Sequence, residues 1–362
     1  MSTPLVRASA PGKLFLFGEY GVLAAGTCVV AAVGRRVFAE RRSDPTGYEA
    51  LGASLDDATA LPEAVLAELP DARRHGCTLG QLSTDIRQLY TDPTSSEDCA
   101  KLGLGSSAAS VVALCAACLL DESAPDSGPR PKGEWHIGIE IRGELFERAF
   151  AAHRRLQGGR GSGADVAASS FGGAIGYRLQ RPAAGFEGLV EPQDFGDHGR
   201  SSSVAAVRPG LSFPEGLRIE PIWLGRPARS TSFVRLCEQA LREAPGPTAD
   251  ALRRTSEIAQ DALDALAGGD SSRLVALVER GDRALDELGA VIEAPIVTPS
   301  HRQLREAAMG TGINVKPSGA GGGDFSLAFG PHDAAWSRFL GRLPQKCRHI
   351  PLEFGVDGVR LE

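Results

Sequence analysis

The sequence predicts an α+β fold of two domains, in which mixed sheets are packed with helices and a ligand site lies on a glycine-rich loop at a helix N-terminus. The chain has 362 residues, enough for about two domains of ordinary size. Strand and helix patterns follow one another in a mixed order, which fits antiparallel pairing better than strict alternation. The glycine-rich stretch 101–109 runs directly into an apolar helix. We expect an N-terminal domain over 1–205, which holds this loop, and a C-terminal domain over 206–362, which holds a second glycine-rich segment.

The expected elements follow from the spacing of apolar residues along the chain. In the first half they are strands over 6–17, 27–41 and 173–180 and helices over 61–69, 79–90, 106–120 and 144–157. Residues 181–202, rich in Pro, Gly, Asp and Ser, predict a linker or a long surface loop. In the second half they are strands over 204–207, 217–224, 325–329 and 349–354 and helices over 232–243, 249–267, 272–288, 300–309 and 333–340.

The charge balance and the cysteine count limit the classes of function. Lys plus Arg total 39 and Asp plus Glu total 45, a net charge of −6, whereas a general binder of nucleic acid or anionic membranes is usually basic. An odd number of seven cysteines in a long chain does not suggest a disulfide framework, so we expect a reducing, cytoplasmic location. Cys115 and Cys118 have C-x-x-C spacing, but they lie on the apolar face of an expected helix and predict core packing. The uncharged stretch 102–120 has the length of a spanning helix, but its first eight residues favour a loop, so we expect no membrane segment.

The stretch 101–109, KLGLGSSAA, is the first segment that suggests chemistry. Two glycines, two hydroxyls and a helix N-terminus place unpaired backbone N–H groups around a point where an anion can bind. The spacing is neither that of a Walker loop nor G-x-G-x-x-G. A structural interpretation stays open, in which Ser106 caps the helix and the glycines form an ordinary turn. A second glycine-rich segment, KPSGAGGGD at 316–324, permits backbone conformations that residues with a Cβ resist.

Two further segments carry isolated charges among small or apolar residues. In 10–21, APGKLFLFGEYG, Lys13 and Glu19 are expensive to bury unless each has a partner. Lys13 is either a group that stabilises phosphate oxygens or half of a structural salt bridge at a strand end. In 161–173, GSGADVAASSFGG, Asp165 is either a helix-start acid or a carboxylate that accepts a proton or orients the attacking group.

Taken together, these segments resemble the motifs of the GHMP kinases, the small-molecule kinases that include galactokinase, homoserine kinase and mevalonate kinase. All three family motifs occur in order: APGKLFLFGEY near the N-terminus, GLGSSAA at 103–109 and SGAGGGD at 318–324. The resemblance implies a two-domain α+β kinase in which ATP lies along the second motif and the acceptor lies between the domains.

Further details are similar to the phosphomevalonate kinases within this superfamily. Tyr20 follows Gly-Glu where mevalonate kinases more often have His, and the stretch 153–168, HRRLQGGRGSGADVAA, matches one that is typical of phosphomevalonate kinases. Leu224 and Phe325 depart from the family pattern in the expected acceptor region. The resemblance implies ATP-dependent phosphorylation of 5-phosphomevalonate to 5-diphosphomevalonate. Mevalonate kinase activity, or a noncatalytic protein that binds a metabolite, are the alternatives.

The resemblance also implies roles for residues of this sequence. It implies ATP and Mg²⁺ as cofactors, phosphomevalonate as the small-molecule partner, no nucleic-acid or membrane partner, and a monomer or homodimer. Whether Asp165 deprotonates the acceptor or only orients it stays open, and His153 is equally compatible with a helix surface. The implied residues are Lys13 and Asp165 for catalysis; Lys101, Gly103, Leu104, Gly105, Ser106, Ser107 and Ala108 for the nucleotide; Ser107, with Ser106 as second choice, for the metal; and Glu19, Tyr20, His153, Ser162, Gly163, Ser318, Gly319, Ala320 and Gly321 for the acceptor.

Overall fold

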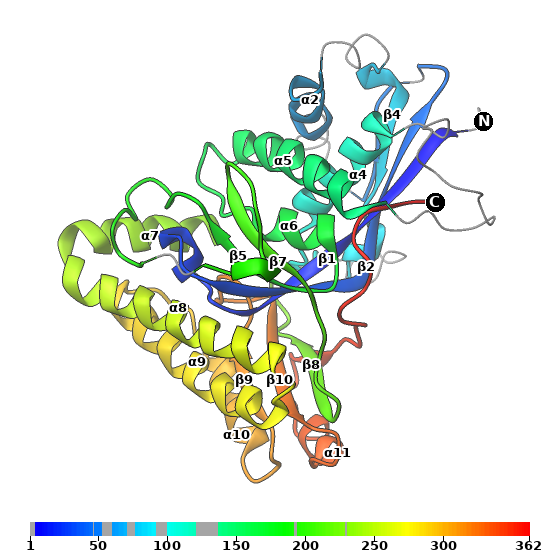
Figure 1. Cartoon of the computed structure of the whole chain (residues 1–362). Coiled ribbons are helices and arrows are strands. Elements are labelled where there is room, and N and C mark those ends of the chain that lie inside the picture. Colours follow the sequence, from blue (N-terminus) through cyan, green and yellow to red (C-terminus); the bar gives the residue numbers. More distant parts are fainter. Residues whose placement is uncertain are drawn as a thin grey trace.

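The computed structural model describes residues 4–45, 47–52, 60–70, 77–91, 100–120, 137–191, 194–228 and 230–362. Their strands form an eight-stranded sheet and a four-stranded sheet, and helices pack on both (Figure 1). The predicted α+β fold with mixed sheets is therefore confirmed. Among the described residues, no helix combines the length and the apolar character that crossing a membrane requires.

Most elements lie within a few residues of their predicted positions. The strands are β1 (Pro4–Phe17), β2 (Cys28–Arg42), β3 (Glu49–Leu51), β4 (Leu82–Asp85), β5 (Ala174–Leu179), β6 (Arg200–Ser201), β7 (Ala205–Leu211), β8 (Leu217–Trp223), β9 (Asn314–Pro317), β10 (Phe325–Pro331), β11 (Arg348–His349) and β12 (Arg360–Leu361). The helices are α2 (Ala60–Ala67), α4 (Ser106–Leu119), α5 (Ile139–Leu156), α6 (Ala164–Phe171), α7 (Ser230–Glu243), α8 (Pro245–Ala267), α9 (Ser271–Val291), α10 (Pro299–Ala308) and α11 (Trp336–Leu340). Short 3₁₀ helices are η1 (Gly21–Ala24), η2 (Leu79–Gln81), η3 (Arg87–Leu89) and η4 (Gly196–His198).

The larger sheet has the strand order β12-β1-β2-β5-β7-β6, with β4 beside β2 and β3 beside β4. The long strands β1 and β2 pair antiparallel, whereas β3 and β4 pair parallel. Helices α4 and α6 pack on β1 and β2, and α8 contacts the same strands from the other side (Figure 1). Cys115 and Cys118 are fully buried in α4, which confirms their predicted place in the core. Cys99 lies outside the described residues.

The smaller sheet, in the order β11-β8-β10-β9, is built by the second half of the chain and is packed against α9 and α10. The last residues leave it and return to the larger sheet, where Leu361 of β12 pairs with Ala8 of β1. Arg36 holds this return, because its buried guanidinium donates to the carbonyl of Gly358 at 2.7 Å. Strand β7 also belongs to the larger sheet, where it pairs with β5. The division of the chain at 205 and 206 stays a prediction.

Two of the predicted elements are wrong. The helix over 79–90 was predicted from the spacing of its apolar residues, but the segment forms η2, β4 and η3. Antiparallel pairing of β4 with β2 outweighs the local helical pattern. Of the strand predicted over 349–354, only His349 belongs to a strand, β11. Pro351 has no N–H with which to continue the strand pairing.

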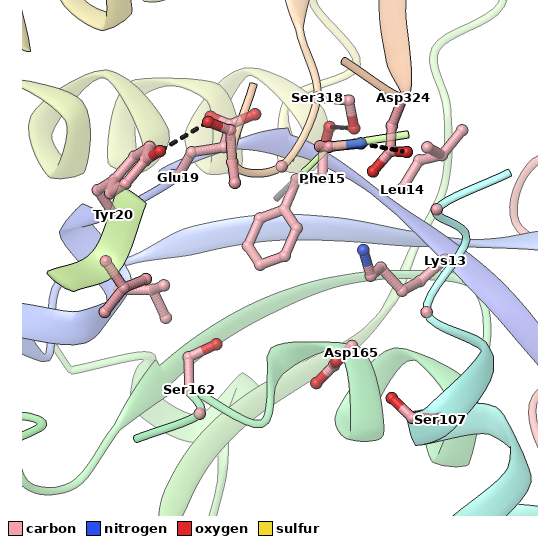
Figure 2. A pocket seen from close by; sticks show the side chains of 18 of the residues that line it. Lys13, Leu14, Phe15, Glu19, Tyr20, Ser107, Ser162, Asp165, Ser318 and Asp324 are labelled. Carbon is pink, nitrogen blue, oxygen red and sulfur yellow. Dashed lines mark hydrogen bonds between the residues drawn. The ribbon is translucent and has the colours of Figure 1, made fainter. Parts of the chain in front are cut away.

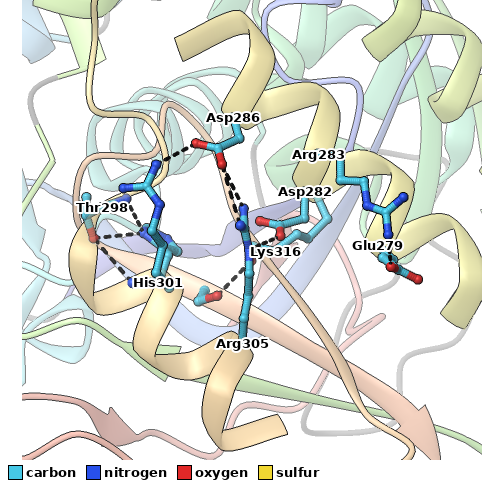
Figure 3. Close-up of polar contacts among 10 residues, drawn as sticks. Glu279, Asp282, Arg283, Asp286, Thr298, His301, Arg305 and Lys316 are labelled. Carbon is cyan, nitrogen blue, oxygen red and sulfur yellow. Dashed lines mark hydrogen bonds and ion pairs between the residues drawn. The ribbon is translucent and has the colours of Figure 1, made fainter. Parts of the chain in front are cut away.

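A polar network fixes α10 on α9 beside the smaller sheet (Figure 3). Asp286 of α9 accepts a hydrogen bond from Arg302 of α10 at 2.8 Å, and Arg305 of α10 forms an ion pair with Asp282 of α9. Lys316 of β9 lies next to this network (Figure 3). The network therefore supports the strand that carries Lys316 toward the larger sheet.

The start of α10 is closed by a buried cap. The backbone N–H of Thr298 donates to Nδ1 of His301 at 3.1 Å, and Nε2 of His301 has no hydrogen-bond partner among the described residues. Burial lowers the pKa of His301 to about 3. The cap therefore requires an uncharged imidazole.

Candidate active site

A cavity of about 440 Å³ lies where the two halves of the chain meet (Figure 2). From the first half it is lined by the end of β1, the loop before α4 and the start of α6. From the second half it is lined by residues within 227–235 and 318–325. The three motifs that the sequence singles out therefore meet at one cavity.

The glycine-rich loop turns into α4 at one wall of this cavity. Gly103 and Gly105 have φ values of 71° and 77°, a backbone region that residues with a side chain rarely adopt. The N–H of Lys13 donates to the carbonyl of Leu104 at 2.9 Å, which ties the loop to β1. The first N–H groups of α4, from Ser106 onward, have no acceptor within the helix. Together with the helix dipole, they favour an anion at this wall.

Lys13 and Asp165 both lie against this loop. A Cβ added to Gly105 would lie 3.0 Å from Cε of Lys13 and 3.7 Å from Cβ of Asp165. Asp165 stands in the first turn of α6, where its Oδ1 accepts a hydrogen bond from the N–H of Val166 at 3.0 Å. Both side chains are half-buried and face the same hollow as Ser107 (Figure 2).

The first motif is joined to the third by buried polar contacts. Glu19 forms an ion pair with Lys316, and their side chains are only 3% and 1% exposed. The hydroxyl of Tyr20 donates to the carbonyl of Ala320 at 2.6 Å, and burial raises the pKa of Tyr20 well above its ordinary value. The hydroxyl of Ser318 donates to a carbonyl of β1 at 2.8 Å (Figure 2). These contacts hold the two halves of the chain together at the cavity.

Most of the predicted site residues line the cavity, although their roles stay predictions. Those that line it are Lys13, Glu19, Tyr20, Lys101, Gly103, Gly105, Ser106, Ser107, Ser162, Asp165, Ser318, Gly319 and Ala320. Those that do not line it are Leu104, Ala108, His153, Gly163 and Gly321. His153 is only 2% exposed, and its Nε2 lies 3.1 Å from Oγ of Ser107. The histidine thus contacts the residue that follows the glycine-rich loop in α4 and does not line the cavity.

Asp324 is a functional candidate that the sequence analysis did not single out. Its Oδ1 accepts a hydrogen bond from the N–H of Ala228 at 3.0 Å, and its carboxylate fills the space beside Gly103, where an added Cβ would lie 2.2 Å away. Burial raises the pKa of Asp324. The sequence signal that could have identified Asp324 is its place at the end of the SGAGGGD motif.

The cavity is locally cationic in a chain whose net charge is −6. Sequence reasoning assigned no role to two of its cations: Arg160, which lies within the quoted stretch 153–168, and Arg235, which lies in no motif. The cationic residues in the described lining are Lys13, Lys101, Arg160 and Arg235, and the acidic ones are Glu19, Asp165 and Asp324. Lys316 neutralises Glu19, and Glu238 pairs with Arg160 at 3.6 Å. Lys13, Lys101 and Arg235 then remain against Asp165 and Asp324, a balance that favours an anionic ligand.

The residues present fit a polyphosphate better than a metal held by protein alone. Within the described ranges, no group of three or more His, Cys, Asp or Glu side chains could hold a metal ion. Mg²⁺ commonly takes one or two protein oxygens and receives its other ligands from phosphates and water. Ser107 and Asp165 offer such oxygens beside the N–H groups of the loop.

Comparisons with known proteins give similarities along nearly the whole chain. No family model matches the sequence. Phosphomevalonate kinase of Streptomyces sp. (strain CL190) is 29% identical over 387 residues, which cover 97% of each chain. Mevalonate kinase of Aeropyrum pernix is 28% identical and covers 88% of this chain and 86% of its own length. The solved structure of Streptococcus pneumoniae phosphomevalonate kinase in complex with phosphomevalonate and AMPPNP superposes with a TM-score of 0.69 at 20% identity, covering 96% of this chain and 99% of that one.

Proposed function

We propose that this chain, which is similar to phosphomevalonate kinase along nearly its whole length, is a GHMP kinase that phosphorylates 5-phosphomevalonate with ATP. The observation that carries the proposal is the meeting of Lys13, Asp165 and the glycine-rich loop at one cationic cavity. Similarity to kinases of this pathway supports the coarser assignment as a phosphotransferase. Because six cysteines of the described chain are free thiols, we place the reaction in a reducing cytoplasm.

The reaction joins a phosphate oxygen of the acceptor to the γ-phosphorus of ATP. The bond between the γ-phosphorus and its bridging oxygen breaks, and that electron pair leaves with ADP. Charge in such a transfer is spread over the equatorial oxygens, so positioning and electrostatics do most of the catalysis. N–H groups along the loop from Gly103 to Ala108 would hold the nucleotide phosphates.

Lys13 and Asp165 have different roles in this proposal. Lys13 neutralises charge on the transferring phosphoryl group, since its side chain crosses Gly105 into the cavity. The second ionisation of a phosphate monoester occurs near pH 6, so much of the acceptor is already ionised near neutral pH. Asp165 therefore acts more by orienting the acceptor than by taking a proton from it.

Ser107 and the phosphates would hold Mg²⁺, which supplies positive charge next to the phosphate oxygens when it is bound. The side chain of Ser107 faces the cavity from the first turn of α4. Ser106 is the less suitable of the two hydroxyls, because its residue is only 4% exposed.

Mevalonate kinase activity is the second candidate, and the 28% identity to an enzyme of that name favours it. Its acceptor is an alcohol, so Asp165 would then have to act as a true base.

The proposal is tested by identifying the product. The purified protein is incubated with ATP, Mg²⁺ and phosphomevalonate, mevalonate, diphosphomevalonate, homoserine or galactose, and ADP release is followed. Phosphorus NMR should show a new diphosphate resonance with phosphomevalonate. Absence of that resonance, with ADP released on another acceptor, would overturn the assignment.

A further inference from the structure

The imidazole of His153 lies directly behind the phosphate loop. His153 occupies the last turn of α5, is only 2% exposed and does not line the cavity. Its Nε2 lies 3.1 Å from Oγ of Ser107, whose side chain does line the cavity. We infer that His153 is a positioning residue that fixes the hydroxyl of Ser107 for nucleotide binding. This inference rests on the proposed function, because it takes the loop to hold the phosphates of ATP.

The hydrogen bonds around Nε2 define what the imidazole does. The side-chain amide nitrogen of Gln157 lies 3.3 Å from the same Nε2. Nε2 of a neutral imidazole has a single lone pair, and with the ring proton on Nδ1 this lone pair accepts one strong hydrogen bond. The inference assigns that bond to the hydroxyl of Ser107, because its Oγ is the nearer of the two atoms at 3.1 Å against 3.3 Å. The lone pairs of Ser107 Oγ are then left free toward the cavity, where a phosphate-bound cation needs an oxygen ligand.

Without this contact the hydroxyl has no fixed orientation. A serine hydroxyl rotates freely about its bond and settles where a partner accepts its hydrogen. If His153 is removed, the hydrogen of Ser107 can turn toward the cavity and compete with the cation for the same oxygen. The histidine is itself held in place, because it is buried in the last turn of a helix whose C-cap residue is Gln157.

The test is calorimetric titration of the full-length protein with ATP in excess Mg²⁺. His153→Leu, which removes every hydrogen-bonding atom, should weaken binding about three- to tenfold, the range of one hydrogen bond. His153→Gln places an amide near the position of Nε2 and should stay within about twofold of the native protein. If His153→Leu does not fold, His153→Asn replaces it, because its shorter amide does not reach Ser107.

A double-variant cycle with Ser107→Ala separates positioning from packing. If His153 acts through Ser107, the effect of His153→Leu disappears in the Ser107→Ala background. Ser106→Ala is the matched control, because in the described structure His153 is hydrogen-bonded to Ser107 and not to this neighbouring hydroxyl. In the Ser106→Ala background the effect of His153→Leu should persist in full.

Each remaining outcome is decisive. A loss that persists in the Ser107→Ala background overturns the inference in favour of packing. A variant that binds nucleotide normally but has a raised KM for the acceptor overturns it in favour of direct acceptor contact. If the native protein binds no nucleotide, the proposed function fails instead, and the two failures are thus distinguished.

Discussion

Removing the positive charge of Lys316 should destabilise the protein strongly. Lys316 and Glu19 form an ion pair with side-chain exposures of 1% and 3%, and Lys316 also donates to the carbonyl of Pro317 at 2.6 Å. Lys316→Met keeps most of the side-chain volume but leaves the carboxylate of Glu19 buried without its partner. Breaking a buried pair in this way costs about 3–5 kcal/mol, a large part of a total stability of about 5–15 kcal/mol.

The assay is urea unfolding followed by circular dichroism, in which the free energy of unfolding is compared with that of the native protein. Lys346→Met is the matched control, because Lys346 is exposed, and it should change the free energy by less than about 0.5 kcal/mol. The double variant Glu19→Gln with Lys316→Met removes both charges and should recover most of the loss. A loss below about 1 kcal/mol for Lys316→Met, or a double variant that is no more stable than the single one, would refute the reasoning.

Three further predictions concern the cap and the cavity. The pKa of His301 is about 3 in the folded protein and 6.5 ordinarily, so the unfolded state binds more protons between these values. The free energy of unfolding should therefore fall as pH drops below 6.5, by up to about 1.4 kcal/mol per pH unit. Thermal unfolding of His301→Asn should lack this contribution, and an unchanged dependence of stability on pH in that variant would contradict the prediction. Asp165→Asn and Lys13→Met should each lower kcat by about a hundredfold with little change in melting temperature, and near-native kcat would remove that residue's catalytic role. Gly105→Val should abolish ATP binding in calorimetry, because the φ of Gly105 is 77° and an added Cβ would lie 3.0 Å from Lys13. Lys101→Ala should only raise KM for an anionic substrate. Normal ATP binding by folded Gly105→Val would exclude the loop as the phosphate site.

The local parts of the site could be predicted from the sequence, because local chemistry determines them. Gly103 and Gly105 stand where the backbone needs a positive φ, and Asp165 stands in the first turn of a helix of small residues. Each of these features depends on neighbours in the sequence. Their meeting at one cavity was expected only from the family resemblance.

Long-range partners could not be predicted in the same way. The sequence showed that Glu19 needs a cation, but the partner is Lys316, 297 positions away, rather than Lys13 nearby. The apolar residues of 79–90 are spaced as in a helix, which is why the sequence predicted one. In the structure this segment lies beside β2, and only the long-range pairing of β4 with β2 distinguishes the two outcomes. His153 was expected at the acceptor, but its contact with Ser107 depends on the packing of α5 beside α4.

The central claim is that the cavity transfers a phosphoryl group to an acceptor that already carries a phosphate. The most direct measurement is the ratio of kcat/KM for phosphomevalonate to kcat/KM for mevalonate, determined in one ADP-release assay. If cations of the cavity lining bind the phosphate of the acceptor, they lose their partner when that phosphate is missing, so the ratio should be at least about tenfold in favour of phosphomevalonate. Equal or better use of mevalonate would contradict the account.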